Sequence, residues 1–286
     1  MRAAAATLRP NIRSSTLPFS EHDVSMRLTV LALDYDGTIA RNDELDPDVR
    51  KAIADARERG ITVVIVTGRI LDDLRRVAGD LGFVDAVVAE NGAVVAFPEA
   101  GRSVTLAAPA PQLLVDDLRR RGLSIHVGHC VIEGDARAAT EFLDAIHCLE
   151  MPYVLMFNCS RLMALPTGIN KANGFREALR TLRLSAHNAI GIGDAENDFD
   201  LLEQCELGVA VAWGSRPLQQ AADEILQGDG PKAVADYIQQ LAATARLAPD
   251  RVGRRRLIVG NDGQGRAISF GVRGRNLLVA GDPKSG

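Results

Sequence analysis

The chain has 286 residues, 47% of them hydrophobic and 24% charged, with a formal net charge of −4. This is the composition of a globular protein of one large or two modest domains, and its slightly acidic balance gives no reason to expect nucleic-acid binding. No apolar run approaches the roughly 18 residues of a membrane span. Four cysteines without CxxC spacing or a secreted disulfide pattern favour reduced thiols in a cytoplasmic protein.

Residues 1–25 are rich in Ala, Arg and Ser and show no sustained hydrophobic period. They lack the apolar region of a secretory signal, although their Arg/Ser bias leaves a transit peptide open. Met26 stands where the first strand must begin. We therefore expect residues 1–25 to be a poorly ordered N-terminal extension.

The apolar run from Leu28 to Asp34 is the first strong element. A run this short, bounded by the Gly37–Thr38 turn, is typical of a strand buried on both faces of a parallel sheet. Ligands of such sheets bind beyond the carboxyl ends of the strands, where Asp34 and Asp36 fall. Two carboxylates placed this close together need a cation, and Mg²⁺, which prefers oxygen ligands, is the expected one.

The next segments alternate between helix and strand. The first helix has clear boundaries, with Asp46 as N-cap, Pro47 at its first position and Gly60 at its end. The pattern then predicts a strand over 61–66, a helix over about 70–81 and a strand over 86–89. This alternation predicts an α/β fold, a doubly wound parallel sheet of the Rossmann-like kind.

From Ala93 the rhythm changes to hairpins and single helices. VVAF and SVTLA flank the turn PEAGR, and YVLMFN and LMALP form a second hairpin pattern. Helices are predicted over about 111–121 and 135–148. We therefore expect residues 93–166 to form a small α+β cap inserted into the core.

The core pattern resumes at Lys171, where a helix is predicted to run to about residue 182. A strand over 189–193 ends at Asp194 and is followed by the loop GDAEND, and a further strand is predicted over 207–212. Ala/Leu-rich segments near 215–222 and 231–243 complete the sheet. The core thus comprises residues 26–92 and 167–243.

Polar side chains follow the predicted strands at the edge where their carboxyl ends meet. Each is weak by itself, because a lone Asp after a strand is commonly a helix cap and a lone lysine is commonly a surface residue. Their order, spacing and placement together favour a single site. The set consists of Asp34, Asp36, Thr67, Lys171, Asp194 and Asp198.

The motifs DYDGT, VTGR, the lysine of GINK, and GDAEND resemble, in this order, motifs I to IV of the haloacid dehalogenase (HAD) superfamily. The resemblance extends over about residues 26–243. The tripeptide ENG at 90–92 and the position of the inserted cap are similar to the Cof-type, C2-capped branch of that superfamily.

The resemblance, together with the residue types, implies phosphoryl transfer through an aspartyl-phosphate. Asp34 would be the nucleophile, and Asp36 would be the general acid and base. Mg²⁺ would be bound by the Asp34 carboxylate, the Asp36 backbone carbonyl and Asp194. Asp198 would either support Mg²⁺ through water or orient the active-site lysine.

The transferring phosphoryl oxygens would be held by the Thr67 hydroxyl, the Lys171 ammonium and the backbone N–H groups of Gly37 and Gly68. Asn197 could join this group, and capping the following helix is an equally good reading of that residue.

We therefore expect a Mg²⁺-dependent phosphomonoesterase acting on a small phosphorylated metabolite of the sugar or polyol phosphate type, without nucleic-acid or membrane partners for this part of the chain. The alternative is a sensing domain that binds a phosphate ligand for an attached module. Because binding alone needs no acid/base group, the presence of both Asp34 and Asp36 favours turnover.

The tail, residues 244–286, is not needed by such a core. Arg254–Arg256 leads into LIVG, the turn NDGQG, the segment RAISFGV and the apolar strand NLLVAG before Gly281–Gly286. A strand followed by GxxxxG resembles the first part of a P-loop, and the layout resembles the start of a HerA/FtsK-type ATPase domain. We expect a linker and the start of such a domain, in a protein that continues as a phosphatase–ATPase fusion.

Overall fold

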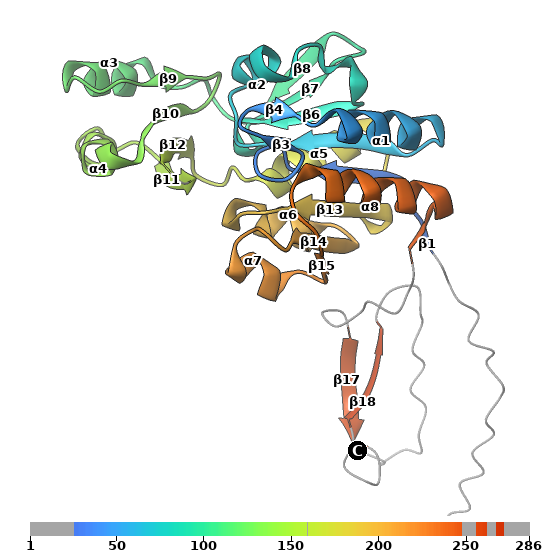
Figure 1. The fold of residues 1–286 in the computed structure, drawn as a ribbon. Helices are drawn as coiled ribbons and strands as arrows, with labels where there is room; N and C mark the ends of the chain where they lie inside the picture. The colour runs from blue at the N-terminus through green and yellow to red at the C-terminus, as the bar shows by residue number, and fades with distance from the viewer. Residues whose placement is uncertain (1–25, 159, 248–255, 262–266, 272–286) are drawn as a thin grey trace, which may run out of the picture.

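The computed structural model of the chain describes residues 26–158, 160–247, 256–261 and 267–271. Most of these residues form an α/β core with a smaller sheet-and-helix unit beside it (Figure 1). The expected N-terminal extension 1–25 and the expected P-loop segment with the strand Leu277–Ala280 lie outside the described residues.

The core is organised around one sheet with the strand order β15-β14-β13-β2-β5-β6-β7-β8. The six strands from β15 to β6 are parallel, and β7 and β8 are antiparallel to their neighbours. The predicted doubly wound sheet is therefore confirmed. The strands span Val30–Leu33 (β2), Thr62–Val66 (β5), Ala86–Ala89 (β6), Val94–Phe97 (β7), Arg102–Thr105 (β8), Ala189–Gly193 (β13), Leu207–Val211 (β14) and Glu224–Leu226 (β15).

The central strand β2 is buried on both faces, as its unbroken apolar run predicts. Leu31 and Leu33 pack into the cluster that includes α1, α2 and α8, whereas Val30 and Ala32 face the cluster that includes α5 and α6. Helices thus cover both faces of the sheet. They span Pro47–Glu58 (α1), Leu71–Ala78 (α2), Lys171–Leu182 (α5), Phe199–Gln204 (α6), Arg216–Ala221 (α7) and Pro231–Thr244 (α8).

The helix boundaries follow the predicted caps. The Asp46 side chain accepts the Asp48 N–H at 2.8 Å, and Pro47 is the first residue of α1. Helix α2 ends three residues before its predicted end at 81, because Gly79 adopts a left-handed backbone with φ +73°. A short 3₁₀ turn, Leu81–Phe83, follows it.

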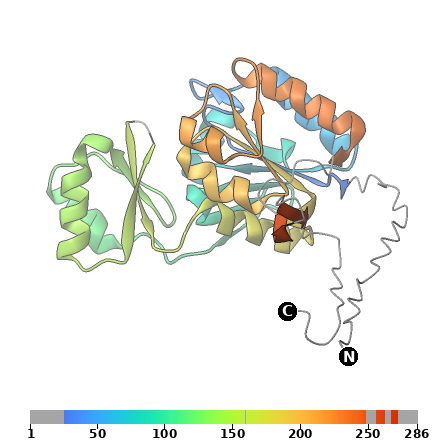
Figure 2. The same cartoon turned by 90° about the horizontal axis from the view of Figure 1, so that it is seen from below.

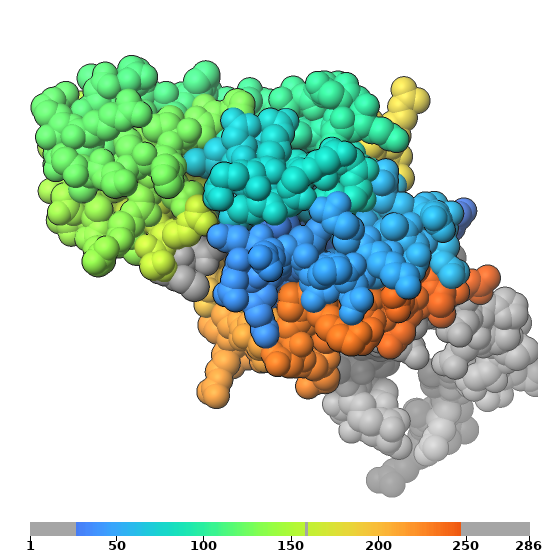
Figure 3. All heavy atoms as spheres, turned by 45° about the horizontal axis from the view of Figure 1, so that its top comes forward, coloured from blue at the N-terminus to red at the C-terminus, as the bar shows by residue number. Residues whose placement is uncertain are grey.

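The second unit is an antiparallel sheet with the strand order β11-β12-β10-β9, and its two helices lie on the side away from the core (Figure 2). Alternate strand residues such as Ile132, Leu162 and Ala164 pack against these helices. The elements span Gln112–Arg120 (α3), His126–Val127 (β9), Ile132–Asp135 (β10), Ala139–Cys148 (α4), Tyr153–Asn158 (β11) and Arg161–Pro166 (β12). In the space-filling view this green unit lies against the teal part of the core that includes α2 (Figure 3).

The start of the cap at residue 93 needs correction. The hairpin β7–β8 extends the core sheet from β6 and does not join the smaller sheet. All four residues of β7 are buried, which suits a strand covered on both faces and not a strand with one face in water. The smaller sheet consequently begins only with β9.

Several short elements carry no clear sequence signal. Strand β15 lies between the two Ala/Leu-rich segments and was not predicted, and neither was the small hairpin of Ala40–Arg41 (β3) with Glu44–Leu45 (β4). Met26–Arg27 (β1) pairs with Arg246–Leu247 (β16). In the tail, Arg256–Asn261 (β17) pairs with Ala267–Gly271 (β18), as the predicted hairpin there requires.

Two sequence expectations concern membrane-spanning helices and the state of the cysteines. No helix in the described ranges combines the length and the apolar character that crossing a bilayer requires. Cys130, Cys148 and Cys205 form no disulfide bond within the described part of the chain, and Cys159 lies outside it.

Candidate active site

The polar residues that follow the core strands meet at one edge of the sheet, as predicted. Asp34 follows β2 and Asp194 follows β13, and these two strands are adjacent and parallel. The Asp34 N–H donates to the Ile192 carbonyl at 2.9 Å, which fixes the backbone of this carboxylate. Thr67 follows β5, on the other side of β2.

Lys171 reaches the same place by a different route. It is the first residue of α5, not the end of a core strand, and it follows the segment that returns from the smaller sheet. The side chain of Asn170 caps this helix by accepting the Asn173 N–H at 2.8 Å. Helix α5 thereby points Lys171 into the core from its N-terminus.

Three carboxylates surround the lysine. Asp34, Asp194 and Asp198 each place an oxygen within 4.8 Å of the others. The Nζ of Lys171 lies 2.5 Å from Asp34 Oδ1 and 2.5 Å from Asp198 Oδ1. The other oxygen of Asp198 accepts the backbone N–H groups of Asp194 and Ala195, each at 3.1 Å. Two roles were considered for Asp198, supporting Mg²⁺ through water or orienting the lysine. Its direct contact with Lys171 favours the second.

Burial dominates the electrostatics of this cluster. Desolvation, followed by the negative charge of Asp198, raises the pKa of Asp34 well above its ordinary value. The same two causes raise the pKa of Asp194 to about 6. Burial by itself lowers the pKa of Lys171, but the charges of Asp198 and Asp34 outweigh it and raise that pKa. Three acids around one cation leave an excess of negative charge.

The cluster is suited to a divalent cation. Asp34 Oδ2 is buried and has no hydrogen-bond partner among the described residues, so it remains available to a ligand. Carboxylate oxygens are hard donors of the type that Mg²⁺ and related cations take. The side chain of Asp36 is not part of this cluster, so only its backbone carbonyl remains as the expected ligand.

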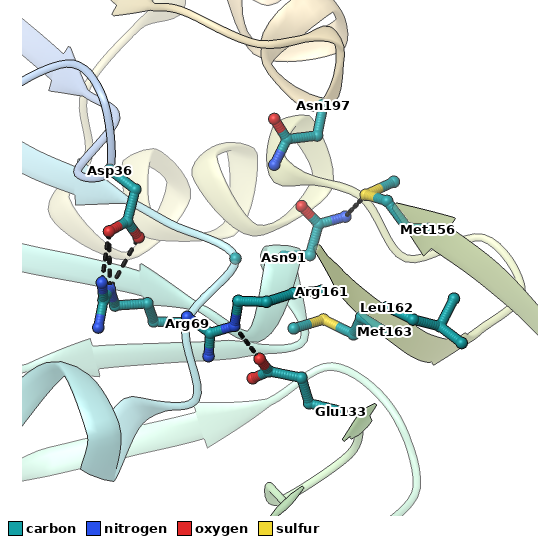
Figure 4. Close-up of a pocket in the computed structure, with 10 residues that line it drawn as sticks. Asp36, Arg69, Asn91, Glu133, Met156, Arg161, Leu162, Met163 and Asn197 are labelled. Carbon is teal, nitrogen blue, oxygen red and sulfur yellow. Dashed lines mark hydrogen bonds and ion pairs between the residues drawn. The ribbon is translucent and has the colours of Figure 1, made fainter. Parts of the chain in front are cut away.

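Asp36 instead pairs with Arg69, a residue that the sequence analysis did not assign. The Nε of Arg69 lies 2.7 Å from Asp36 Oδ2, and its Nη2 lies 2.5 Å from Asp36 Oδ1 (Figure 4). The same guanidinium also contacts Asp43 and Asp73. The backbone N–H of Arg69 donates to the Thr67 hydroxyl at 3.1 Å. The signal was present in VTGR, where the arginine stands two residues after Thr67.

The motif I turn is held by residues from distant parts of the chain. Gly37 has φ +77°, and a Cβ there would lie 2.3 Å from Asp194 Oδ2, so glycine is needed both for conformation and for space. Thr38 donates its hydroxyl to Asp194 Oδ1 at 3.4 Å. The indole N–H of Trp213 donates to the Gly37 carbonyl at 2.7 Å. Thr38 and Trp213 were not predicted to take part in the site.

A cavity lies between the core and the smaller sheet (Figure 4). Its core side includes Gly68 and Asn197, two of the residues predicted to meet the phosphoryl group. The residue at the N-cap position of α6 is Asp198 and not Asn197, which removes the capping alternative for Asn197. The lining residues are Asp36, Gly68, Arg69, Asn91 and Asn197 from the core and Glu133, Met156, Arg161, Leu162 and Met163 from the smaller sheet.

Comparison with known proteins agrees with this geometry. The family profile of the haloacid dehalogenase-like hydrolases matches residues 31–120 and 150–238. A phosphoglycolate phosphatase of Methanosarcina acetivorans is 25% identical over 232 residues, which cover 75% of this chain and 98% of that protein. A phosphoglycolate phosphatase of Natronomonas pharaonis is 31% identical over 206 residues, covering 68% of this chain and 89% of that protein.

The fold has been solved in related proteins. The structure of the HAD subclass IIB sugar phosphatase BT4131 superposes with a TM-score of 0.60 at 17% identity, over 74% of this chain and 98% of that one. The profile match includes Asp34, Lys171 and Asp194. The chain therefore belongs to the haloacid dehalogenase-like hydrolases.

Proposed function

We propose that this protein hydrolyses small phosphate monoesters in a Mg²⁺-dependent reaction that passes through a phosphorylated Asp34. The observation that carries the proposal is the asymmetry of the Asp34 carboxylate. Lys171 holds Oδ1 at 2.5 Å, while Oδ2 is buried without a hydrogen-bond partner among the described residues. One oxygen is fixed in position and the other is available for chemistry.

Asp34, Asp194 and Asp198 would hold the cation, with the Asp36 backbone carbonyl. Bound Mg²⁺ supplies positive charge that offsets the repulsion between these carboxylates and an incoming phosphate. The all-oxygen donor set suits hard divalent cations, of which Mg²⁺ is the one proposed here. Lys171 stays charged because Asp34 and Asp198 accept hydrogen bonds from it. Its charge lowers the pKa of Asp34 and so favours the ionised form that attack requires, against the effect of burial.

In the first step Asp34 forms a bond from oxygen to phosphorus while the ester bond to the leaving oxygen breaks. Asp36, at the wall of the cavity, would give a proton to that leaving oxygen and then remove one from the water that attacks phosphorus. Thr67, Gly68, Gly37 and Lys171 are assigned to the phosphoryl oxygens.

Asn197 extends this phosphoryl contact set, because it lines the cavity beside Gly68. A Cβ added at Gly68 would lie 3.9 Å from Asn197 Nδ2, which places the amide next to the backbone turn. A phosphoryl group at Gly68 would thus have an additional donor within reach.

We assign residues 108–166 as the cap of this enzyme, because the cavity is formed jointly by the core and by β10, β11 and β12. A cavity with the cap as one of its walls favours small substrates over phosphoproteins. The expected sugar or polyol phosphates remain candidates, and the named relatives add phosphoglycolate. The free thiols of the described residues suit a cytoplasmic protein.

The competing function is a phosphate-ligand sensor, which would need the binding groups but no turnover. One assay distinguishes the two functions. It measures phosphate release from a panel of sugar phosphates, polyol phosphates and phosphoglycolate, once with Mg²⁺ and once with EDTA. We expect turnover of at least one ester only when Mg²⁺ is present. Saturable binding of these esters without release of phosphate would favour the sensor and overturn the enzyme proposal.

A further inference from the structure

The cap presents one defined set of side chains to the cavity. Met156 on β11 lies opposite Met163 on β12, which lies opposite Glu133 on β10. These three residues and Arg161 line the same cavity as Asp36 and Gly68 of the core. A phosphate monoester bound at Gly68 would therefore direct its leaving group toward this row of cap residues.

Arg161 is the one cation that the described part of the cap contributes to this cavity. Its Nε donates to Glu133, which is only 5% exposed, so the guanidinium is held in one orientation. Its Nη2 lies 4.0 Å from Asp73 Oδ2, beyond hydrogen-bond distance, and no other described residue accepts a hydrogen bond from its Nη groups. Figure 4 shows the side chain reaching from β12 toward Arg69.

The guanidinium of Arg161 keeps its charge in these surroundings. Burial lowers the pKa of Arg161, but the hydrogen bond to Glu133 and the charge of that carboxylate outweigh burial and raise it. On the core side the group faces one cation, Arg69, and one carboxylate, Asp73. Met156 and Met163 flank the group with apolar surface, which strengthens an ion pair formed there. The two Nη groups of an oriented guanidinium match the two oxygens of a carboxylate.

Asn91 supplies a second and independent indication of a ligand. The residue is 1% exposed and lines the cavity, and its Oδ1 has no hydrogen-bond partner among the described residues. Its Nδ2 is turned toward Met156 Sδ at 3.1 Å (Figure 4). A buried carbonyl oxygen without a donor is costly, and a hydroxyl group of a bound molecule would satisfy it.

We propose that Arg161 and Asn91 together recognise the leaving group, and that the substrates are small phosphorylated hydroxy acids. The carboxylate would bind the Nη groups of Arg161, and a hydroxyl would donate to Asn91 Oδ1. Glu133 is a positioning residue that orients Arg161. This inference rests on the proposed phosphatase function and narrows its substrate class from polyol phosphates to those that carry a carboxylate.

The test compares 3-phosphoglycerate with glycerol 3-phosphate, which replaces the carboxylate by a hydroxymethyl group on the same skeleton. We expect the wild-type enzyme with Mg²⁺ to prefer 3-phosphoglycerate by at least about 10-fold in kcat/KM, as one bidentate charged contact would give. In Arg161→Met this preference should fall to within about 2-fold, mainly through KM, and Arg161→Lys should lie between the two.

The matched control is Arg120→Met. Arg120 is also a cap arginine paired with a carboxylate, Asp117, but it lies on α3 at the far side of the cap sheet. The substrate preference of the Arg120→Met variant should equal that of the wild type. Melting temperatures of all variants show whether each is folded. A third ester, the phosphate of 3-hydroxypropionate, lacks the hydroxyl and should be a poorer wild-type substrate than 3-phosphoglycerate.

The possible failures are distinguishable. If the wild type releases phosphate from glycerol 3-phosphate as readily as from 3-phosphoglycerate, or if Arg161→Met keeps the preference, the hydroxy-acid inference is wrong and the phosphatase function stands. If loss of the hydroxyl has no effect, the assignment of Asn91 is wrong. If the wild type releases phosphate from no ester, the proposed function fails and the inference fails with it.

Discussion

The ammonium nitrogen of Lys171 lies 2.5 Å from Asp34 Oδ1, although 137 positions separate the two residues in the chain. The cap is inserted between them, so the chain must leave and re-enter the core before this contact can form. Asp198, on a third segment, completes the arrangement at 2.5 Å from the same nitrogen. This buried lysine links the first half of the core, which carries Asp34 of motif I, to the second half, which carries Asp198.

Replacing this lysine should destabilise the protein. Lys171→Met leaves Asp34 and Asp198 buried without their cation, and we expect a loss of about 3–5 kcal/mol in the free energy of unfolding of metal-free protein near pH 8. Urea titration measures it. The control Lys232→Met removes an exposed lysine that pairs with Asp48 and Asp236 and should change that energy by less than about 1 kcal/mol. Equal effects of the two substitutions would contradict the role given to Lys171.

The metal-free protein should lose stability as the pH rises. The pKa of Asp194 is about 6 in the folded state against an ordinary value of 3.8, so its contribution is fully present below about pH 4 and is lost as the pH passes about 6. The difference corresponds to a change on the order of 2–3 kcal/mol. Melting temperatures in EDTA should therefore fall from pH 5 to 7.5 more steeply for the wild type than for Asp194→Asn.

The same linkage predicts that protons and Mg²⁺ compete. Saturating Mg²⁺ should remove most of the difference between wild type and Asp194→Asn in how steeply the melting temperature falls with pH, because the ion stabilises the ionised carboxylate. The affinity for Mg²⁺, measured by calorimetry, should rise between pH 5 and 7.5. A metal affinity independent of pH over this interval would show that Asp194 is not a ligand.

Gly37 offers a substitution with a close control. Gly37 and Gly60 both have φ +77°, but a Cβ at Gly37 would lie 2.3 Å from Asp194 Oδ2, whereas nothing lies within 4 Å at Gly60. Both alanine variants should lose about 1–2 kcal/mol of stability from backbone strain. Only Gly37→Ala should also weaken Mg²⁺ binding by at least about 10-fold, the effect of roughly 1.4 kcal/mol on a binding constant. Similar Mg²⁺ affinities in the two variants would disprove the steric argument.

Asp36→Asn tests the acid/base assignment. We expect kcat for an alkyl phosphate to fall by about 10²–10⁴-fold, the usual contribution of a positioned general acid or base. The loss should be smaller for 4-nitrophenyl phosphate, whose leaving group needs no proton. Unaltered hydrolysis of alkyl phosphates by a folded Asp36→Asn protein would exclude this role.

The buried strands β2, β5, β6, β13 and β14 and the residues that follow them could be predicted because both depend on local signals. Apolar runs mark the buried strands, and Asp46, Pro47 and Gly60 mark the first helix as the structure has it. The hairpin β7–β8 was misplaced because its own pattern shows that it is a hairpin but not which sheet it joins. That choice depends on the unpaired edge of β6, which is a long-range property.

The site shows the same limit. Asp34 and Asp194 follow strands that the sequence identifies, whereas the partners of Arg69 come from three separate segments. Asn91 belongs to the tripeptide ENG, but the sequence does not show that its side chain faces the cavity, which follows only from the structure and its buried oxygen without a donor. Residues that act through long-range packing cannot be found from spacing alone.

The central claim is that Asp34 becomes phosphorylated. The direct measurement is a rapid acid quench of the wild-type enzyme turning over a ³²P-labelled ester with Mg²⁺, followed by peptide mapping, with a folded Asp34→Asn variant in parallel. The account predicts label on the peptide that contains Asp34, no label in the variant, and a fall in phosphate release of at least about 10³-fold in that variant. Label on another residue, or appreciable turnover by Asp34→Asn, would contradict it.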